Sequence, residues 1–376
     1  MIRLATQDGK SRALFEGRSA VQFTEPDLLV FAREGVLYGQ HIDWRAGRVR
    51  GGPFAISDSV RYFYSTGTAA FATSAGGTLV FQPGGDVNRP FWFDREGKNL
   101  GAAAPSGDYL DLALSRDGRT LLFSRTWPGI GTYDIWSFDL ARGVESRLTS
   151  NRGSEFSPLW MPGGRTIVHT AQTEGLPQIF LRDLESGSEK LLRPSDGFQI
   201  PSGTTPDGKT LIYVERTERS GFTPRRMRLD DDSPSVPLLP AGIHTESVRL
   251  SPDGRTLALI TDESGAPEAY VMPFPGPGAR VRVSNDGAAG MRWSSDGREL
   301  FYLAPRTGLM AVAVTTTPML TVGRPARIVP PEIAGRWRGY EVASDGRRFL
   351  AIVPEVNANL LPLSVIVNWP AASPGK

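Results

Sequence analysis

The stretch LSPDGRTLALI, Leu250–Ile260, reads as a short strand, a tight turn and a second strand. Apolar residues stand on both sides of Ser-Pro-Asp-Gly, and the glycine supplies the positive φ that a tight hairpin turn needs. Near copies occur elsewhere: LALSRDGRTLLF from Leu112, TTPDGKTLIYV from Thr204, RWSSDGRELFYL from Arg292 and VASDGRRFLAIV from Val342. A hairpin that recurs in this way predicts a repeat architecture.

The spacing of the copies can be measured from the turn glycines. They are Gly77, Gly118, Gly164, Gly208, Gly254, Gly297 and Gly346, with gaps of 41, 46, 44, 46, 43 and 49 residues. A degenerate copy, QFTEPDLLVFA at 22–32, has Asp27 in place of the glycine, 50 residues before Gly77. Eight copies therefore account for the whole chain.

Each copy has the pattern of four short antiparallel strands, which is the pattern of one propeller blade. A single blade has two apolar faces, and stacking blades around an axis buries both of them. We therefore expect an all-β fold: residues 1–376 form a single closed β-propeller of eight blades. Seven blades are the alternative, if the degenerate first copy merges with the terminal strands. Trp136, Trp160 and Trp293 occupy matching strand positions, where we expect them to pack between blades.

The ring has to be closed by pairing of its N-terminal and C-terminal strands. The last copy offers YEVAS, RFLAIVP and LSVIVNW but lacks a fourth strand. We expect SRALF, residues 11–15, to complete the last blade as its outermost strand. IRLATQ, residues 2–7, then either pairs further out or displaces LSVIVNW from the third position, and the sequence leaves both arrangements open.

Composition limits the functional classes. The formal net charge is only +2, so no global field draws the chain to nucleic acid or to anionic lipid. The chain has no cysteine, which excludes disulfides and thiolate chemistry. We find no signal peptide and no apolar stretch long enough to span a membrane, so the chain as written would be cytoplasmic, but its compartment stays unknown. We expect a monomer. An extracytoplasmic origin stays open if the chain was part of a longer protein.

The Ser-Pro-Asp-Gly turns resemble those of the TolB-like propeller repeat, most clearly in RLSPDGRTLAL and RWSSDGRELFY. The opening LLVFAREGVLYGQHID and the closing SVIVNWP resemble the propellers found C-terminal to bacterial serine/threonine kinases. The resemblance covers all 376 residues and implies a WD40-like, kinase-associated sensor or scaffold domain. No kinase motif is present in the sequence, so such a domain would be separated from its kinase.

The sequence offers little catalytic chemistry. It has no Gly-x-Ser-x-Gly pentapeptide, and its three histidines, His41, His169 and His244, lack the spacing of a zinc site. We expect His41 and His169 to be structural, since both lie within strands. No catalytic residue, cofactor or metal site is assigned from the sequence.

The loops that enter the first strands should crowd one mouth of the central channel. Aromatic, acidic and arginine side chains at these positions would form a binding funnel. The candidates are Tyr62, Tyr64, Asp111, Glu155, Phe198, His244, Glu246, Arg292, Arg336, Tyr340 and Glu341. The alternative is that these residues merely solvate a polar axis.

Two main functions follow. The first is a non-catalytic module that binds a protein or peptide partner, or senses a ligand, at the channel mouth. The second is a propeller enzyme, a metal-assisted hydrolase or lyase acting on a small sugar or lactone. An enzyme of this kind needs at least three carboxylate, Asn or His groups together at the axis, whereas a binding module needs an exposed aromatic and arginine patch.

Overall fold

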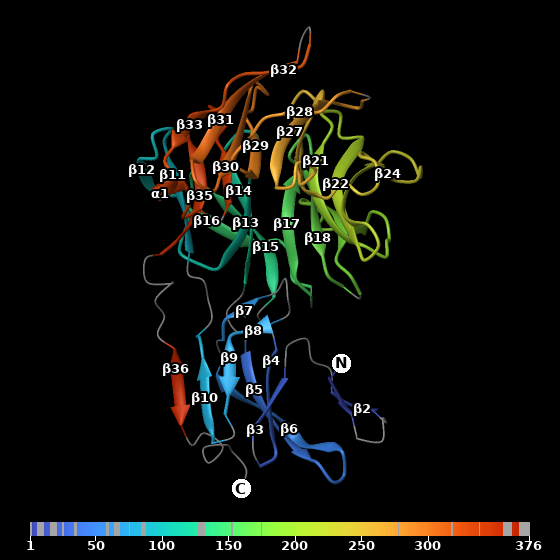
Figure 1. The fold of residues 1–376 in the computed structure, drawn as a ribbon, viewed down its shortest axis with the longest axis vertical. Helices are drawn as coiled ribbons and strands as arrows, with labels where there is room; N and C mark the ends of the chain where they lie inside the picture. The colour runs from blue at the N-terminus through green and yellow to red at the C-terminus, as the bar shows by residue number, and fades with distance from the viewer. Residues whose placement is uncertain are drawn as a thin grey trace. The chain divides into compact units, whose positions relative to one another are not determined.

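The structure is a computed structural model, and it describes most of the chain (Figure 1). The described residues are 2–5, 11–15, 21–24, 26–33, 36–57, 60–63, 68–74, 76–83, 88–126, 132–151, 153–173, 175–276, 278–316, 319–337, 339–355 and 363–367.

The chain divides into two compact units. The first comprises Met1–Val87, Thr126–Thr132 and Glu355–Lys376, and the second comprises Asn88–Arg125 and Tyr133–Pro354. One propeller domain spanning residues 1–376 stays a prediction.

The first unit contains short antiparallel sheets. One has four strands in the order β3-β4-β5-β6, a second has the order β36-β10-β9, and two hairpins are formed by β1-β2 and β7-β8. Their bounds are β1 Ile2–Ala5, β2 Ser11–Phe15, β3 Val21–Thr24, β4 Leu28–Arg33, β5 Val36–Asp43, β6 Arg48–Ser57, β7 Tyr62–Phe63, β8 Thr68–Ala69, β9 Phe71–Thr73, β10 Thr78–Phe81 and β36 Ser364–Val367.

The second unit contains six antiparallel sheets among its described residues. Four of them take their strands in sequence order: β13 to β16, β17 to β20, β21 to β24 and β25 to β28. The bounds are β13 Tyr109–Leu114, β14 Thr120–Thr126, β15 Tyr133–Asp139, β16 Val144–Arg147, β17 Glu155–Trp160, β18 Thr166–Ala171, β19 Gln178–Asp183, β20 Glu189–Leu191, β21 Phe198–Thr204, β22 Thr210–Thr217, β23 Gly221–Arg228, β24 Val236–Pro237, β25 Thr245–Leu250, β26 Thr256–Thr261, β27 Glu268–Pro273 and β28 Val281–Arg282.

The other two sheets depart from this simple order. The fifth runs β29-β30-β31-β32 with β33 also paired to β31, and the sixth runs β12-β11-β35-β34. Their bounds are β29 Ala289–Trp293, β30 Glu299–Ala304, β31 Gly308–Thr315, β32 Thr321–Val322, β33 Ala326–Val329, β11 Asn88–Phe93, β12 Asn99–Ala102, β34 Gly339–Val342 and β35 Phe349–Pro354. The single described helix, α1, is Pro331–Ala334. The expectation of an all-β fold built from four-stranded antiparallel sheets is confirmed, and no described helix is long and apolar enough to cross a membrane.

The repeated turn has the geometry that its sequence predicts. Ser251 Oγ donates to Asp253 Oδ1 at 2.6 Å, and Asp253 Oδ1 accepts the amide of Arg255 at 3.0 Å. The same pair of bonds is made by Ser115 with Asp117, by Thr205 with Asp207 and by Ser294 with Asp296. Because the bonds form within a few residues of chain, each turn fixes the register of its own hairpin.

Asp27 and the seven turn glycines of the repeat each lie between two paired antiparallel strands. The pairs are β3 with β4, β9 with β10, β13 with β14, β17 with β18, β21 with β22, β25 with β26, β29 with β30 and β34 with β35. Two of these hairpins lie in the first unit and six in the second. The repeat is therefore confirmed as a series of hairpins, while eight blades in one ring stay a prediction.

The last sheet corrects the expectation for the terminal strands. β35 pairs with β11, Asn88 opposite Pro354 and Phe93 opposite Phe349, and β12 is the outermost strand (Figure 1). LSVIVNW does not take the third position, because its strand β36 pairs instead with β10. SRALF is not the fourth strand either: it forms β2, which pairs with β1. The strand after the Gly77 hairpin, β11, has thus joined the sheet of the Gly346 hairpin, and the strand after the Gly346 hairpin, β36, has joined that of Gly77. The spacing of the repeats in the sequence does not reveal this exchange.

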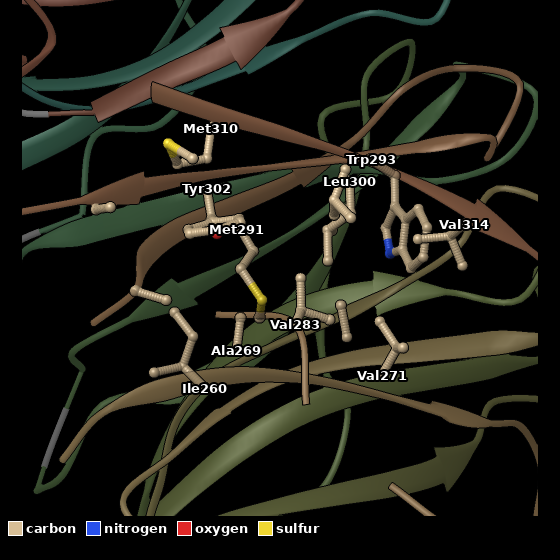
Figure 2. Close-up of a cluster of buried hydrophobic side chains, with 14 residues drawn as sticks. Ile260, Ala269, Val271, Val283, Met291, Trp293, Leu300, Tyr302, Met310 and Val314 are labelled. Atoms are coloured by element: carbon tan, nitrogen blue, oxygen red, sulfur yellow. The ribbon is translucent and has the colours of Figure 1, made fainter. Parts of the chain in front are cut away.

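Neighbouring sheets bury their apolar faces against each other. Figure 2 shows Ile260, Ala269 and Val271 of the β25–β28 sheet facing Met291 and Leu300 of the next sheet. The second strand β26 is buried along its whole length, since every residue from Thr256 to Thr261 is buried. Since successive strand residues point to opposite faces, both faces of this sheet are covered.

Two of the three tryptophans also link neighbouring sheets through hydrogen bonds. Trp160 Nε1 donates to the Ala113 carbonyl of the preceding sheet at 3.1 Å, and Trp293 Nε1 donates to the Arg249 carbonyl at 3.2 Å. Trp136 lies instead in the buried cluster with Tyr109 and Phe123. The expected packing role of these tryptophans agrees with these positions.

Gly254 and Gly164 provide a matched test of the repeated turn. Both have positive φ, 73° and 69°, but an added Cβ would lie 2.7 Å from Pro206 Cδ at Gly254 and would meet nothing within 4 Å at Gly164. We expect Gly164→Ala to lower stability by about 1 kcal/mol, from the left-handed conformation alone, and Gly254→Ala by more. Thermal unfolding of both variants checks this. Equal losses would show that the contact with Pro206 is without consequence.

Candidate binding site at the first strands

The first strands of the six sheets in the second unit contact one another in order. β13 contacts β17, β17 contacts β21, β21 contacts β25, β25 contacts β29 and β29 contacts β34, while β34 also contacts β13. Side chains at equivalent places on these strands can therefore meet, although their positions in the sequence are far apart.

Charged residues gather on four of these strands. Arg249 of β25, Arg292 of β29 and Glu341 of β34 each stand five residues before a turn glycine, and Asp111 of β13 stands seven before Gly118. We call these four residues the inner cluster. The residues five before the glycine on β13, β17 and β21 are Ala113, Leu159 and Gly203, so the charge is confined to one part of the series.

The centre of the inner cluster is an ion pair. Arg292 Nε donates to Glu341 Oε1 at 2.7 Å, and the two side chains are 21% and 19% exposed. The guanidinium also lies over the Tyr340 ring, 5.7 Å from its centroid. Burial opposes the charge of Arg292, but Glu341 and Tyr340 outweigh it and raise the pKa of Arg292. Charge-assisted pairing of this kind fixes the guanidinium in place.

Asp111 is committed to the fold. Its Oδ1 accepts the amide and the hydroxyl of Ser124 at 3.1 and 2.6 Å, and its Oδ2 accepts the Ser157 amide of the next sheet at 2.6 Å. Ser157 has a φ of 53° and is the one non-glycine residue with positive φ in the described chain. Burial raises the pKa of Asp111, and the hydrogen bonds from Ser124 and Ser157, which lower it, offset only part of this effect. Asp111 thus holds a strained strand start rather than presenting a free carboxylate.

Arg249 differs from the other three members. Its Nη1 donates to the Val248 carbonyl at 2.9 Å, but no ion pair between described residues includes it. Burial, and then the charge of Arg292, lower the pKa of Arg249 to about 9, so the guanidinium is still charged at neutral pH. A half-buried guanidinium with remaining donors and a second arginine beside it is suited to an anion such as a carboxylate.

The structure brings together Asp111, Arg292, Tyr340 and Glu341 from the residues that the sequence proposed. Tyr340 is buried in an apolar cluster with Trp337 and Phe349, and it contacts the inner cluster through the Arg292 guanidinium that lies over its ring. Sequence reasoning overlooked Arg249. Its place five residues before a turn glycine, shared with Arg292 and Glu341, was the signal that could have found it.

The other candidates lie elsewhere or outside the description. Phe198 packs on Phe156 with ring centroids 6.0 Å apart, and His244 packs edge-on against Phe222 at 5.3 Å. Glu246 and Arg336 are exposed. Glu155 is completely buried and belongs to another polar group, with His169 and Glu189. Tyr62 lies in β7 of the first unit, and Tyr64 lies outside the described residues.

The fold and this site define a β-propeller of repeated Ser-x-Asp-Gly hairpins with a charged inner cluster. Comparison with known proteins agrees. Residues 103–247 match the family model of the TolB beta propeller domain. These residues therefore carry TolB-like propeller repeats, as the turn motif indicated.

Individual relatives are more distant. The chain is 32% identical over 105 residues to an uncharacterised protein of Agrobacterium fabrum, an alignment covering 27% of this chain and 33% of that protein. The match thus spans about a third of that relative's length. A solved structure described as a candidate TolB of Agrobacterium tumefaciens has a TM-score of 0.54 at 16% identity, covering 71% of this chain and 98% of that one.

A solved oligogalacturonate lyase in complex with manganese has a TM-score of 0.45 at 14% identity, covering 76% of this chain and 96% of that one. At such identities the likeness to solved structures concerns the fold alone, so neither binding nor catalysis follows from it. A link to bacterial kinases stays a prediction.

The Arg292–Glu341 pair can be tested by removing one partner. Glu341→Gln leaves Arg292 and Arg249 near each other without the compensating carboxylate, and we expect a loss of about 2 kcal/mol in unfolding free energy. Glu246→Gln is the matched control, because it makes the same change on an exposed side chain of β25. Urea denaturation of both variants measures the difference. If the two variants unfold alike, the pair does not stabilise the first strands.

Proposed function

We propose that the chain is a non-catalytic binding module of bacterial type, whose TolB-like propeller takes a carboxylate-bearing segment of a protein or peptide partner at the inner cluster. The observation that carries this proposal is Arg249, a half-buried cation that no described ion pair includes. Arginine in such a setting supplies parallel donors that match a carboxylate. The partner would enter through the mouth of a channel formed by the closed ring of first strands.

The neighbouring charges support an anionic ligand rather than a cationic one. Glu341 is already engaged by Arg292, and both carboxylate oxygens of Asp111 accept hydrogen bonds from within the sheets. The carboxylates of the inner cluster are therefore occupied while one guanidinium has donors to spare. Electrostatic complementarity of this kind orients a partner and selects against competitors of the wrong charge.

The described side chains favour binding over the alternative of a propeller enzyme. A metal-assisted hydrolase or lyase acting on a small sugar or lactone would need three or more ligating groups beside its substrate. Within the described part of the chain, the one group of three such residues is Glu155, His169 and Glu189, and none of them belongs to the inner cluster. A sensor role beside a kinase remains compatible with a binding module.

A displayed library of random twelve-residue peptides tests the proposal directly. We expect enriched peptides to carry a carboxylate that binding requires, and we expect Arg249→Met to weaken their binding at least tenfold. Arg255→Met is the control, because Arg255 is an exposed turn arginine only six residues away. Fluorescence anisotropy with a labelled enriched peptide measures all three proteins. The proposal fails if no peptide is enriched, or if Arg249→Met binds as tightly as the unchanged chain.

A further inference from the structure

A polar group is buried within the sheet β17–β20. Glu155 begins β17, His169 lies in β18 and Glu189 begins β20, so three of the four strands contribute one side chain each. One possible ligand atom from each residue lies within 4.8 Å of those of the other two. Glu155 and His169 are completely buried, and the Glu189 side chain is 19% exposed. We call this set the sheet-face cluster.

Two polar atoms of the sheet-face cluster have no hydrogen-bond partner among the described residues. Glu155 Oε2 and His169 Nδ1 are both buried and unpaired. The other ring nitrogen, His169 Nε2, lies 3.3 Å from Glu189 Oε1. An unsatisfied buried polar group costs about 1–3 kcal/mol, and this sheet contains two such atoms at one place. A bound cation would give these atoms a partner.

The other copies of the repeat show that the fold does not require these residues. Five residues after the turn glycine, where His169 stands, the other sheets of the second unit have Phe123, Tyr213, Leu259, Tyr302 and Ala351, all buried. Nine residues before the glycine, where Glu155 stands, they have Tyr109, Gln199, Thr245, Ala288 and Trp337. Only this sheet places an imidazole and a carboxylate at the two positions together, so packing does not explain them.

We propose that Glu155, His169 and Glu189 bind a divalent transition-metal ion of the Zn²⁺ class. Carboxylate oxygen and imidazole nitrogen are both ligand types that bind such ions. Ligand atoms around a tetrahedral ion with bonds of about 2.1 Å lie about 3.4 Å apart, close to the His169–Glu189 separation of 3.3 Å. The remaining separations between possible ligand atoms are at most 4.8 Å.

Outer groups already orient the two carboxylates. Asn151 Nδ2 donates to Glu155 Oε1 at 2.6 Å and to Glu189 Oε2 at 3.2 Å, and Arg182 Nη1 donates to Glu189 Oε1 at 2.8 Å. Such second contacts are characteristic of metal ligands, because they fix the direction of the donor atoms. The ion would join the first, second and fourth strands of the sheet, so its role would be to clamp that sheet.

The competing explanation is a metal-free ion cluster in which a protonated His169 bridges the two carboxylates. The His169 ring, followed by Arg182, lowers the pKa of Glu189 to about 2, while burial raises the pKa of Glu155. The bridging explanation predicts that the chain takes up no stoichiometric metal. The two explanations are therefore separable by direct binding.

Equilibrium dialysis against Zn²⁺ alone, with Co²⁺ absorption as the spectroscopic probe, tests the proposal on the full chain. We expect one Zn²⁺ per chain, a Co²⁺ visible spectrum typical of oxygen and nitrogen ligands, and a Tm several degrees higher with Zn²⁺ than with EDTA. His169→Phe should weaken Zn²⁺ binding at least tenfold and should still fold, since Phe123 occupies the equivalent place in the preceding sheet. Glu155→Gln should have the same effect on binding.

Two controls keep the result specific. Glu145→Gln changes the carboxylate of the preceding sheet that pairs with Arg125 at 2.7 Å, and His244→Asn removes a histidine outside the cluster. Both should bind Zn²⁺ as the unchanged chain does. Absence of stoichiometric Zn²⁺, or binding that survives both His169→Phe and Glu155→Gln, overturns the proposal.

Discussion

Burial of both faces of each small sheet is the constraint on which the second unit depends. A four-stranded sheet alone would expose one apolar face or both, whereas the second strand Thr256–Thr261 is buried at every residue. The apolar side chains of neighbouring sheets interdigitate, as Trp293, Leu300 and Val314 do beside Val271. Because each sheet needs a neighbour on both sides, the first strands come into mutual contact, and the inner cluster is a consequence of that contact.

The exchange of strands between two copies of the repeat joins the beginning and the end of the second unit within one sheet. β11 follows the Gly77 hairpin in sequence, yet it pairs with β35 of the last copy over six residue pairs. Its partner in the exchange, β36, pairs with β10. Pairing between residues near 90 and near 350 joins the beginning and the end of the second unit by backbone hydrogen bonds, so the sixth sheet contains strands from both. Backbone pairing of this kind satisfies strand edges that would otherwise be open.

Comparison of equivalent positions in the repeats also distinguishes residues that maintain the fold from residues that are candidates for function. Turn acids such as Asp117, Asp207 and Asp296 recur with the same hydrogen bonds and so belong to the hairpin. An acid at the start of a third strand also recurs: Asp134 pairs with Arg147, and Glu268 pairs with Arg282. Arg249 differs from Arg292, which occupies the same repeat position, because no ion pair between described residues includes it. The other sheets of the second unit have no histidine at the position of His169. These two differences carry the two proposals.

The sequence by itself determined the hairpins, because a Ser-x-Asp-Gly turn is stabilised by atoms within a few residues and needs no distant partner. It therefore predicted the strands, the turn geometry and the all-β class, and its spacing pointed to Arg292 and Glu341. Only the tertiary structure decided the exchange of β11 with β36, the commitment of Asp111 to Ser157, and the meeting of Glu155, His169 and Glu189. These contacts join strands from different sheets or residues distant in sequence, and their energies depend on which faces come together, which local patterns do not encode.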